Sequence, residues 1–102
     1  MPSVEQLTKL MAADPTDPFA PYALAMEHTK LGQLVTALDF FDRCLALDSG
    51  YCYAYFHKAQ VQKTLGDRLG ARATLTHGIA AAKKVGDGKA LNELSGLLDE
   101  LE

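Results

Sequence analysis

The 102-residue sequence has few cysteines and no long hydrophobic run, and both shortages narrow the class of protein it can encode. The first ten residues already carry Glu5 and Lys9, and apolar runs elsewhere are only a few residues long, so the sequence predicts neither a signal peptide nor a membrane-spanning helix. Its two cysteines, Cys44 and Cys52, are typical of reduced thiols in a small intracellular domain. We therefore expect a cytoplasmic protein with no membrane partner.

An excess of positive charge is also missing. The formal net charge is -3 and the isoelectric point about 5.5, whereas proteins that bind phosphate backbones are usually basic. Nucleic acid is therefore not a predicted partner. The charge is unevenly placed, because residues 58–89 hold seven basic and two acidic side chains, while residues 90–102 hold four acidic ones and no basic one. The basic segment is either an ordinary solvated helix surface or a region that meets an acidic partner.

The residue patterns of common catalytic and metal sites are absent as well. His28, His57 and His77 fall on three different predicted helices, and no two of them form a ligand pair at one-turn spacing. Cys52 and His57 are five residues apart, which directs them to different sides of a helix. No glycine-rich loop follows a strand, and no nucleophile elbow is found. We predict no catalytic residue, no metal and no cofactor, and expect that the protein is not an enzyme.

A repeat of 34 residues is the clearest pattern that is present. Shifting the sequence on itself by this distance aligns identical residues without a gap: Ala20 with Ala54, Ala25 with Ala59, Leu31 with Leu65, Gly32 with Gly66, Ala37 with Ala71, and Ala46 with Ala80. A fixed period of this length is typical of helical repeats, in which each repeat is one helix pair. Carried backwards, the frame places Leu7 over Phe41, so residues before 18 are predicted to be the second half of a preceding repeat.

Apolar spacing and turn residues give the predicted helix ends. Gly32 and Gly66 stand where a helix should end in a left-handed residue, and Asp67 can cap the helix that follows. The predicted helices are Ser3–Ala13, Phe19–Leu31, Leu34–Leu47, Cys52–Leu65, Asp67–Lys84 and Lys89–Leu101. The last of these leaves the 34-residue frame, yet its leucines form one stripe opposite a polar side, which is typical of a helix that caps an array.

Period and residue types together resemble the tetratricopeptide repeat family, in particular its small bacterial members. The small residues that this family places on facing helices match Ala25 with Ala37, and Ala59 with Ala71. Its other characteristic positions match large apolar Leu24, Phe41, Tyr55 and Leu75, small Cys44 and Gly78, and the closing proline Pro15. The resemblance implies an all-α fold, an α-α superhelix of antiparallel helix pairs, with about six helices and a C-terminal capping helix.

The expected organisation is a single domain over residues 1–102. It comprises a leading half-repeat at 3–17, repeats at 18–51 and 52–85, and a capping helix at 89–101. Some positions depart from the family pattern. Pro21 replaces a bulky residue, and Ser49 and Lys83 stand where a proline usually closes the repeat. We expect the first departure to weaken local packing, and the others to alter the turns between repeats.

In the tetratricopeptide plan the first helix of each pair lines a concave groove. Transferred to this sequence, the outward stripe comprises Phe19, Tyr22, Met26 and Thr29, then Tyr53, Phe56, Gln60 and Lys63. Aromatic side chains beside methionine are typical anchors of protein interfaces. Two other interpretations stay open: the stripe is covered by the chain's own ends, or it is exposed without a role.

The resemblance therefore implies a non-catalytic scaffold that binds a peptide or partner segment in the groove. The predicted partner-binding residues are Phe19, Tyr22, Met26, Tyr53, Phe56, Gln60 and Lys63. Lys63 could meet an acidic peptide or a C-terminal carboxylate. The lysine and asparagine clamp that some family members use for chaperone C-termini is not predicted, because its sites hold Tyr22, Met26 and His57. The alternative is a homodimer or larger homo-oligomer, an assembly module that uses the same apolar surface.

Overall fold

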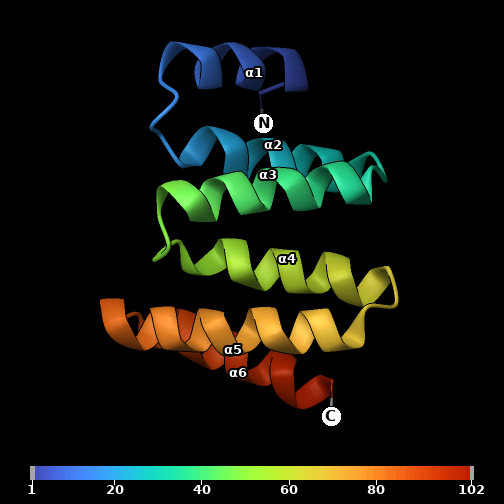
Figure 1. The fold of residues 1–102 in the computed structure, drawn as a ribbon, viewed down its shortest axis with the longest axis vertical. Helices are drawn as coiled ribbons and strands as arrows, with labels where there is room; N and C mark the ends of the chain where they lie inside the picture. The colour runs from blue at the N-terminus through green and yellow to red at the C-terminus, as the bar shows by residue number, and fades with distance from the viewer. Residues whose placement is uncertain (1, 102) are drawn as a thin grey trace. The chain divides into compact units, whose positions relative to one another are not determined.

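The computed structural model describes residues 2–101, which form six helices and no strand (Figure 1). The helices are α1 (Val4–Ala13), α2 (Phe19–Lys30), α3 (Leu34–Leu47), α4 (Cys52–Thr64), α5 (Arg68–Val85) and α6 (Gly88–Glu100). Every helix end lies within one residue of its predicted position, and the prediction of an all-α protein is confirmed. Within the described residues, no helix is both long enough and apolar enough to span a bilayer.

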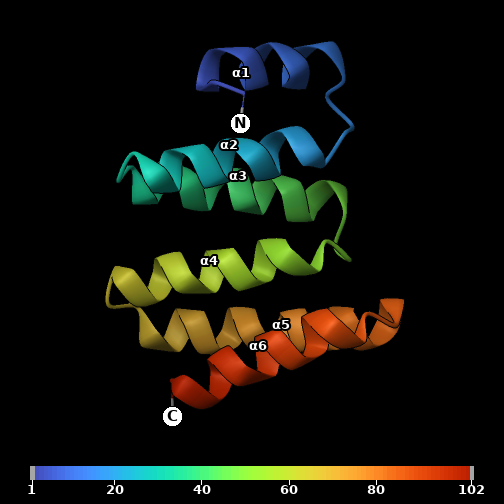
Figure 2. The same cartoon turned by 180° about the vertical axis from the view of Figure 1, so that it is seen from behind.

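The chain divides into two compact units. Unit 1 is Met1–Asp48 and contains α1, α2 and α3, whereas unit 2 is Ser49–Glu102 and contains α4, α5 and α6. Inside each unit, consecutive helices run antiparallel, as the two opposite views show (Figures 1 and 2). In unit 1, α2 packs against both α1 and α3; in unit 2, α4, α5 and α6 all pack against one another. The predicted division into a half-repeat, two repeats and a cap within a single domain stays a prediction.

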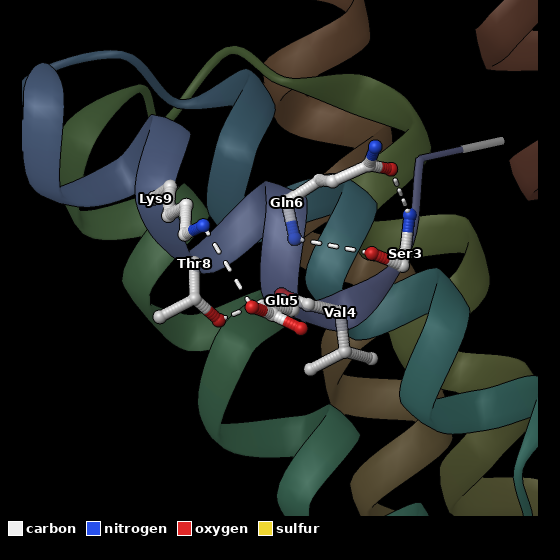
Figure 3. A network of polar contacts seen from close by, with 6 residues as sticks. All are labelled: Ser3, Val4, Glu5, Gln6, Thr8 and Lys9. Carbon is white, nitrogen blue, oxygen red and sulfur yellow. Dashed lines mark hydrogen bonds and ion pairs between the residues drawn. The ribbon is translucent and has the colours of Figure 1, made fainter.

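Helix α1 begins with reciprocal hydrogen bonds between side chains and backbone (Figure 3). The Gln6 N–H donates to Ser3 Oγ at 3.1 Å, and the Ser3 N–H donates to Gln6 Oε1 at 2.8 Å. This capping box satisfies two backbone donors that the first turn of a helix leaves without a partner. Lys9 and Glu5, 3.7 Å apart, add an exposed ion pair on the next turn. Sequence-local bonds therefore fix the start of the chain's first helix.

The two predicted glycine turns end α2 and α4. Gly32 has φ 74° and Gly66 has φ 81°, a backbone conformation that other residues rarely adopt. One residue later, the Gln33 N–H donates to the His28 carbonyl at 2.9 Å, which closes the helix end in the manner of a Schellman motif. Both predictions of a left-handed glycine are confirmed.

Aspartate caps begin α5 and α6. Asp67 accepts the Gly70 N–H at 2.9 Å, as predicted, and Asp87 accepts the Ala90 N–H at 3.0 Å. Removing such a cap typically costs about 1 kcal/mol of stability. The Asp87 cap explains why α6 begins one residue earlier than the sequence indicated.

The core of unit 1 is centred on α2. Leu7 of α1 and Leu24 of α2 are completely buried together, and Phe41 of α3 is completely buried as well. Ala25 and Ala37, the predicted small residues of the α2–α3 pair, have no exposed surface. Small side chains at a helix crossing let the two backbones approach closely, so the predicted role of these alanines fits their burial.

The core of unit 2 is larger because α6 closes it. Ala59 and Ala71, the second predicted alanine pair, are completely buried. Helix α6 contributes the buried Leu94 and Leu97 to the same cluster, and its C-cap residue contributes the buried Leu101. Arg68 at the start of α5 donates from Nη1 to the Leu101 carbonyl at 3.1 Å. The last helix is therefore buried on one side and exposed on the other.

Candidate functional site

The predicted stripe of unit 1 lies on α2 and is partly exposed. Phe19 opens the helix with 46% of its surface accessible, whereas Tyr22, Met26 and Thr29 are half-buried. The ring of Tyr22 meets the buried Phe41 ring edge-on, with centroids 6.3 Å apart. Phe19 is thus the large apolar side chain of this stripe that a partner can reach without displacing the core of unit 1.

The predicted stripe of unit 2 lies on α4 and changes character along the helix. Tyr53 and Phe56 are half-buried and pack against the core cluster of unit 2, whereas Gln60 and Lys63 are exposed. Lys63 Nζ lies 3.8 Å from Glu100 Oε2 on α6. Both side chains are largely exposed, so this ion pair is worth at most about 1 kcal/mol and can exchange with a partner's carboxylate.

Carboxylates of α6 and of its N-cap residue lie near the first half of α4. Burial, followed by the nearby carboxylates of Glu93 and Asp87, raises the pKa of the Tyr53 hydroxyl, which also bonds to Glu93. Burial lowers the pKa of His57, against smaller opposing effects of Gln60 and Glu93. Tyr53 and His57 on α4 therefore lie near a carboxylate of the last helix, Glu93.

Among the described residues, seven large apolar side chains outside the predicted stripe are exposed, and Val35 and Leu69 are the most exposed of them. Val35 near the start of α3 is 69% exposed, and Leu69 near the start of α5 is 78% exposed, which makes Leu69 the most exposed large hydrophobic residue of the described chain. The two are equivalent under the 34-residue shift, and that correspondence was the signal available in the sequence. Each follows a glycine turn, at Gly32 or Gly66, and so lies at the tip of a helix hairpin.

Both cysteine thiols are buried and are therefore unreactive. Cys44 is completely buried, and burial together with the Asp48 carboxylate raises its pKa to about 12. Cys52 is also buried, and its Sγ donates to the Gly50 carbonyl at 3.3 Å. A nucleophilic or metal-binding cysteine acts as the thiolate, which burial disfavours. Across residues 2–101, no three His, Cys, Asp or Glu side chains gather in a way that could hold a metal ion.

The comparison with solved structures decides the family. A tetratricopeptide repeat domain protein from Salinibacter ruber, solved by solution NMR, is 35% identical and superposes with a TM-score of 0.81, over 87% of this chain and 90% of that one. The chain belongs to the tetratricopeptide repeat family. No protein-family model matches the sequence, so the assignment depends on this relative and on the repeat geometry.

Two curated proteins resemble the chain in sequence, and one of them is a tetratricopeptide repeat protein. A TPR repeat-containing protein of Pseudomonas aeruginosa is 25% identical over 99 residues, which is 97% of this chain and 94% of that protein. U-box domain-containing protein 70 of rice is 36% identical over 72 residues, which is 71% of this chain but only 9% of the rice protein. The tetratricopeptide chain therefore spans a small part of the rice protein and nearly all of the bacterial one.

More distant structures share the tetratricopeptide fold. The TPR2B domain of yeast Sti1, solved as a complex with pHsp70, superposes with a TM-score of 0.90 at 21% identity, over 96% of this chain and 78% of that one. PcrH, solved with the chaperone-binding region of PopD, superposes with a TM-score of 0.89 at 20% identity, over 96% and 74%. At these identities the likeness establishes the fold of this chain and nothing about its partners.

Proposed function

We propose that this tetratricopeptide protein is a non-catalytic scaffold that binds a peptide or an extended segment of a protein partner. The observation that carries the proposal is the exposed Phe19 on α2, the first helix of its pair, beside half-buried Tyr22 and Met26. Exposed aromatic side chains that are held rigidly on a helix are effective anchors, because little conformational entropy is lost when a partner covers them.

The proposal draws support from proteins of the same fold. The Sti1 domain was solved with pHsp70 and PcrH with a region of PopD, so this fold accepts peptide segments in both. Binding of a segment uses the helix surface and needs no catalytic group. We therefore assign the chain the same class of activity without assigning it either partner.

Each unit contributes its own contacts in this proposal. In unit 1, Phe19, Tyr22 and Met26 form an apolar contact surface. In unit 2, Tyr53 and Phe56 offer ring edges, while Gln60 and Lys63 supply polar contacts. A partner carboxylate would replace Glu100 beside Lys63, so an acidic segment is the preferred class. The preference is modest, because the Lys63 site is exposed to water.

The test uses substitutions at exposed positions, since Tyr22 and Phe56 also stabilise the cores of their units. Partners are captured from a lysate of the source organism, identified by mass spectrometry, and their segments titrated into the purified chain. The combined variant Phe19→Glu with Gln60→Glu should weaken binding at least about tenfold. The control Leu69→Glu changes an even more exposed apolar residue outside both stripes and should bind like the wild type. Equal binding by all three proteins would refute the assigned surface.

The preference for an acidic partner segment is tested separately. Glu100→Gln frees Lys63 and should strengthen binding of an acidic segment a few-fold, whereas Lys63→Gln should weaken it. Light scattering of the purified wild type tests the competing homo-oligomer function. A monomer at high concentration disfavours self-assembly, and an oligomer that the Phe19→Glu substitution dissociates would favour it over partner binding.

A further inference from the structure

Unit 1 contains an apolar cleft that the scaffold function does not use. The cleft has a volume of about 510 Å³ and shares no residue with the proposed contact stripes. It is lined by Thr8, Met11, Ala12, Pro15, Pro21, Arg43, Ala46 and Leu47. These residues come from α1, α3, the loop after α1 and the first turn of α2. Helices α1 and α3 both pack on α2 but make no close backbone contact with each other, so the space between them is left to side chains.

The cleft exists because Pro21 occupies a position where the next repeat has the bulkier Tyr55. Under the 34-residue shift Pro21 corresponds to Tyr55, and Pro15 corresponds to Ser49. In unit 2 the Tyr55 hydroxyl donates to the Ser49 carbonyl at 2.7 Å, so its ring fills the space between these positions. In unit 1 both positions are prolines, which line the cleft instead of filling it. The departure from the family pattern at Pro21 thus leaves open the space that the Tyr55 ring fills in unit 2.

Arg43 is the single charged residue of the lining. Its guanidinium lies over the Phe40 ring, 5.2 Å from the centroid, and Nη1 is 3.9 Å from Met11 Sδ. Asp39 lies one turn earlier on the same helix, yet among the described residues no carboxylate is paired with this guanidinium. Thr8, the other polar lining residue, donates its hydroxyl to the Val4 carbonyl at 2.7 Å. The cleft therefore combines an apolar wall with one cation, and no carboxylate within residues 2–101 forms an ion pair with it.

We propose that this cleft binds a small amphiphilic carboxylate with a straight hydrocarbon chain, of the medium-chain fatty acid class. The tail lies against the prolines and alanines, and the carboxylate bonds to the Arg43 guanidinium in the two-pronged geometry that arginine favours. An apolar cavity of about 150 Å³ holds a benzene molecule. The cleft has more than three times that volume, which suits a chain of roughly ten carbons better than a single protein side chain, and it falls within the size range of ligand pockets.

The probes are decanoate and the uncharged decanol, each titrated below its micellar concentration into the ¹⁵N-labelled full chain and followed by NMR. Decanoate should shift the amides of Met11, Ala12 and Ala46, and should bind about tenfold tighter than decanol because only the acid engages Arg43. Shortening the chain to octanoate should weaken binding by up to about fifteenfold, since each buried methylene contributes about fourfold. Shifts centred elsewhere, or equal affinity of acid and alcohol, would overturn the proposal.

Two kinds of variant test the charged part and the apolar part of the site independently. Arg43→Met keeps the apolar stem and should reduce decanoate affinity to that of decanol, whereas Lys9→Met removes an exposed cation outside the lining and should change nothing. Pro21→Tyr restores the residue of the equivalent position and should abolish binding of both probes by filling the cleft. Ala46→Phe fills the cleft from α3 and gives an independent check if the first variant folds poorly. Unchanged decanoate binding in a folded cleft-filling variant would overturn the site.

Discussion

Gly78 on α5 lies directly against Tyr55 on α4. A Cβ atom built on Gly78 would stand 2.7 Å from the Tyr55 Cβ and 3.1 Å from Leu94 Cδ2, distances at which something must move. Because Leu94 belongs to α6, this one small residue sets how closely all three helices of unit 2 approach. The tetratricopeptide pattern predicts a small residue at this position, and the contact shows the physical reason for it.

The first prediction is that Gly78→Ala destabilises the protein. Alanine normally stabilises a helix relative to glycine by about 0.5–1 kcal/mol, but here the added methyl group collides with Tyr55, and overpacking costs about 1–3 kcal/mol. Chemical denaturation should show a lower free energy of unfolding. Gly96 on α6 is the control, since a Cβ there meets nothing within 4 Å, and Gly96→Ala should stabilise. A stabilised Gly78→Ala variant would mean that the α4–α5 contact is looser than described.

The second prediction concerns the alanine crossing of the same unit. Ala71 is completely buried at the α4–α5 pair, whereas Ala73, two residues later, is exposed. Ala71→Leu should cost about 1–3 kcal/mol because the helices would have to separate, while Ala73→Leu should change stability by less than about 0.5 kcal/mol. Thermal melting followed by circular dichroism distinguishes the two variants. Equal melting midpoints would contradict the assignment of Ala71 to the crossing.

Local sequence signals account for most of what could be predicted. The glycines after α2 and α4 and the Asp67 cap fixed helix ends to within one residue, because each acts through a bond or backbone angle of its own segment. The 34-residue period identified the buried alanines, since a repeat must place small residues wherever its helices cross. These features are encoded over short distances, so the sequence alone was sufficient to place them.

Features that depend on packing between helices were harder to predict from the sequence. The tetratricopeptide plan placed Tyr53 and Phe56 on an outward stripe, but it could not show that they pack against the core cluster to which α6 contributes, because α6 leaves the repeat frame. The same pattern marked Pro21 as a departure without showing that it opens a cleft, since the cleft also needs Ala46 from α3 and Ala12 from α1. Such outcomes depend on which side chains fill a space between elements.

The third prediction concerns Cys44, whose burial raises its pKa from an ordinary value of 9.0 to about 12. Above about pH 9 the unfolded chain loses the thiol proton while the folded chain keeps it, so the unfolded state binds fewer protons and stability falls as pH rises. Cys44→Ala should remove this contribution, and its free energy of unfolding should decline less steeply than that of the wild type between about pH 9 and 10.5. Parallel declines would show that the native thiol ionises normally.

The fourth prediction follows from the opposite shift at His57, where burial lowers the pKa below the ordinary 6.5. As pH falls below about 6.5, the unfolded chain takes up a proton on this histidine before the folded chain does, so acid favours unfolding and stability is lost. Glu93 on α6 and Gln60 on α4 oppose this effect without reversing it.

His57→Gln keeps a polar side chain at the site but cannot titrate, so its free energy of unfolding should vary less between about pH 5 and 7 than that of the wild type. Urea denaturation at closely spaced pH values measures the difference. A parallel loss of stability in the two proteins would contradict this prediction. It would mean that the imidazole is protonated as easily in the folded state as in the unfolded chain. The contact of α6 with this part of α4 would then be more open to water than the structure describes.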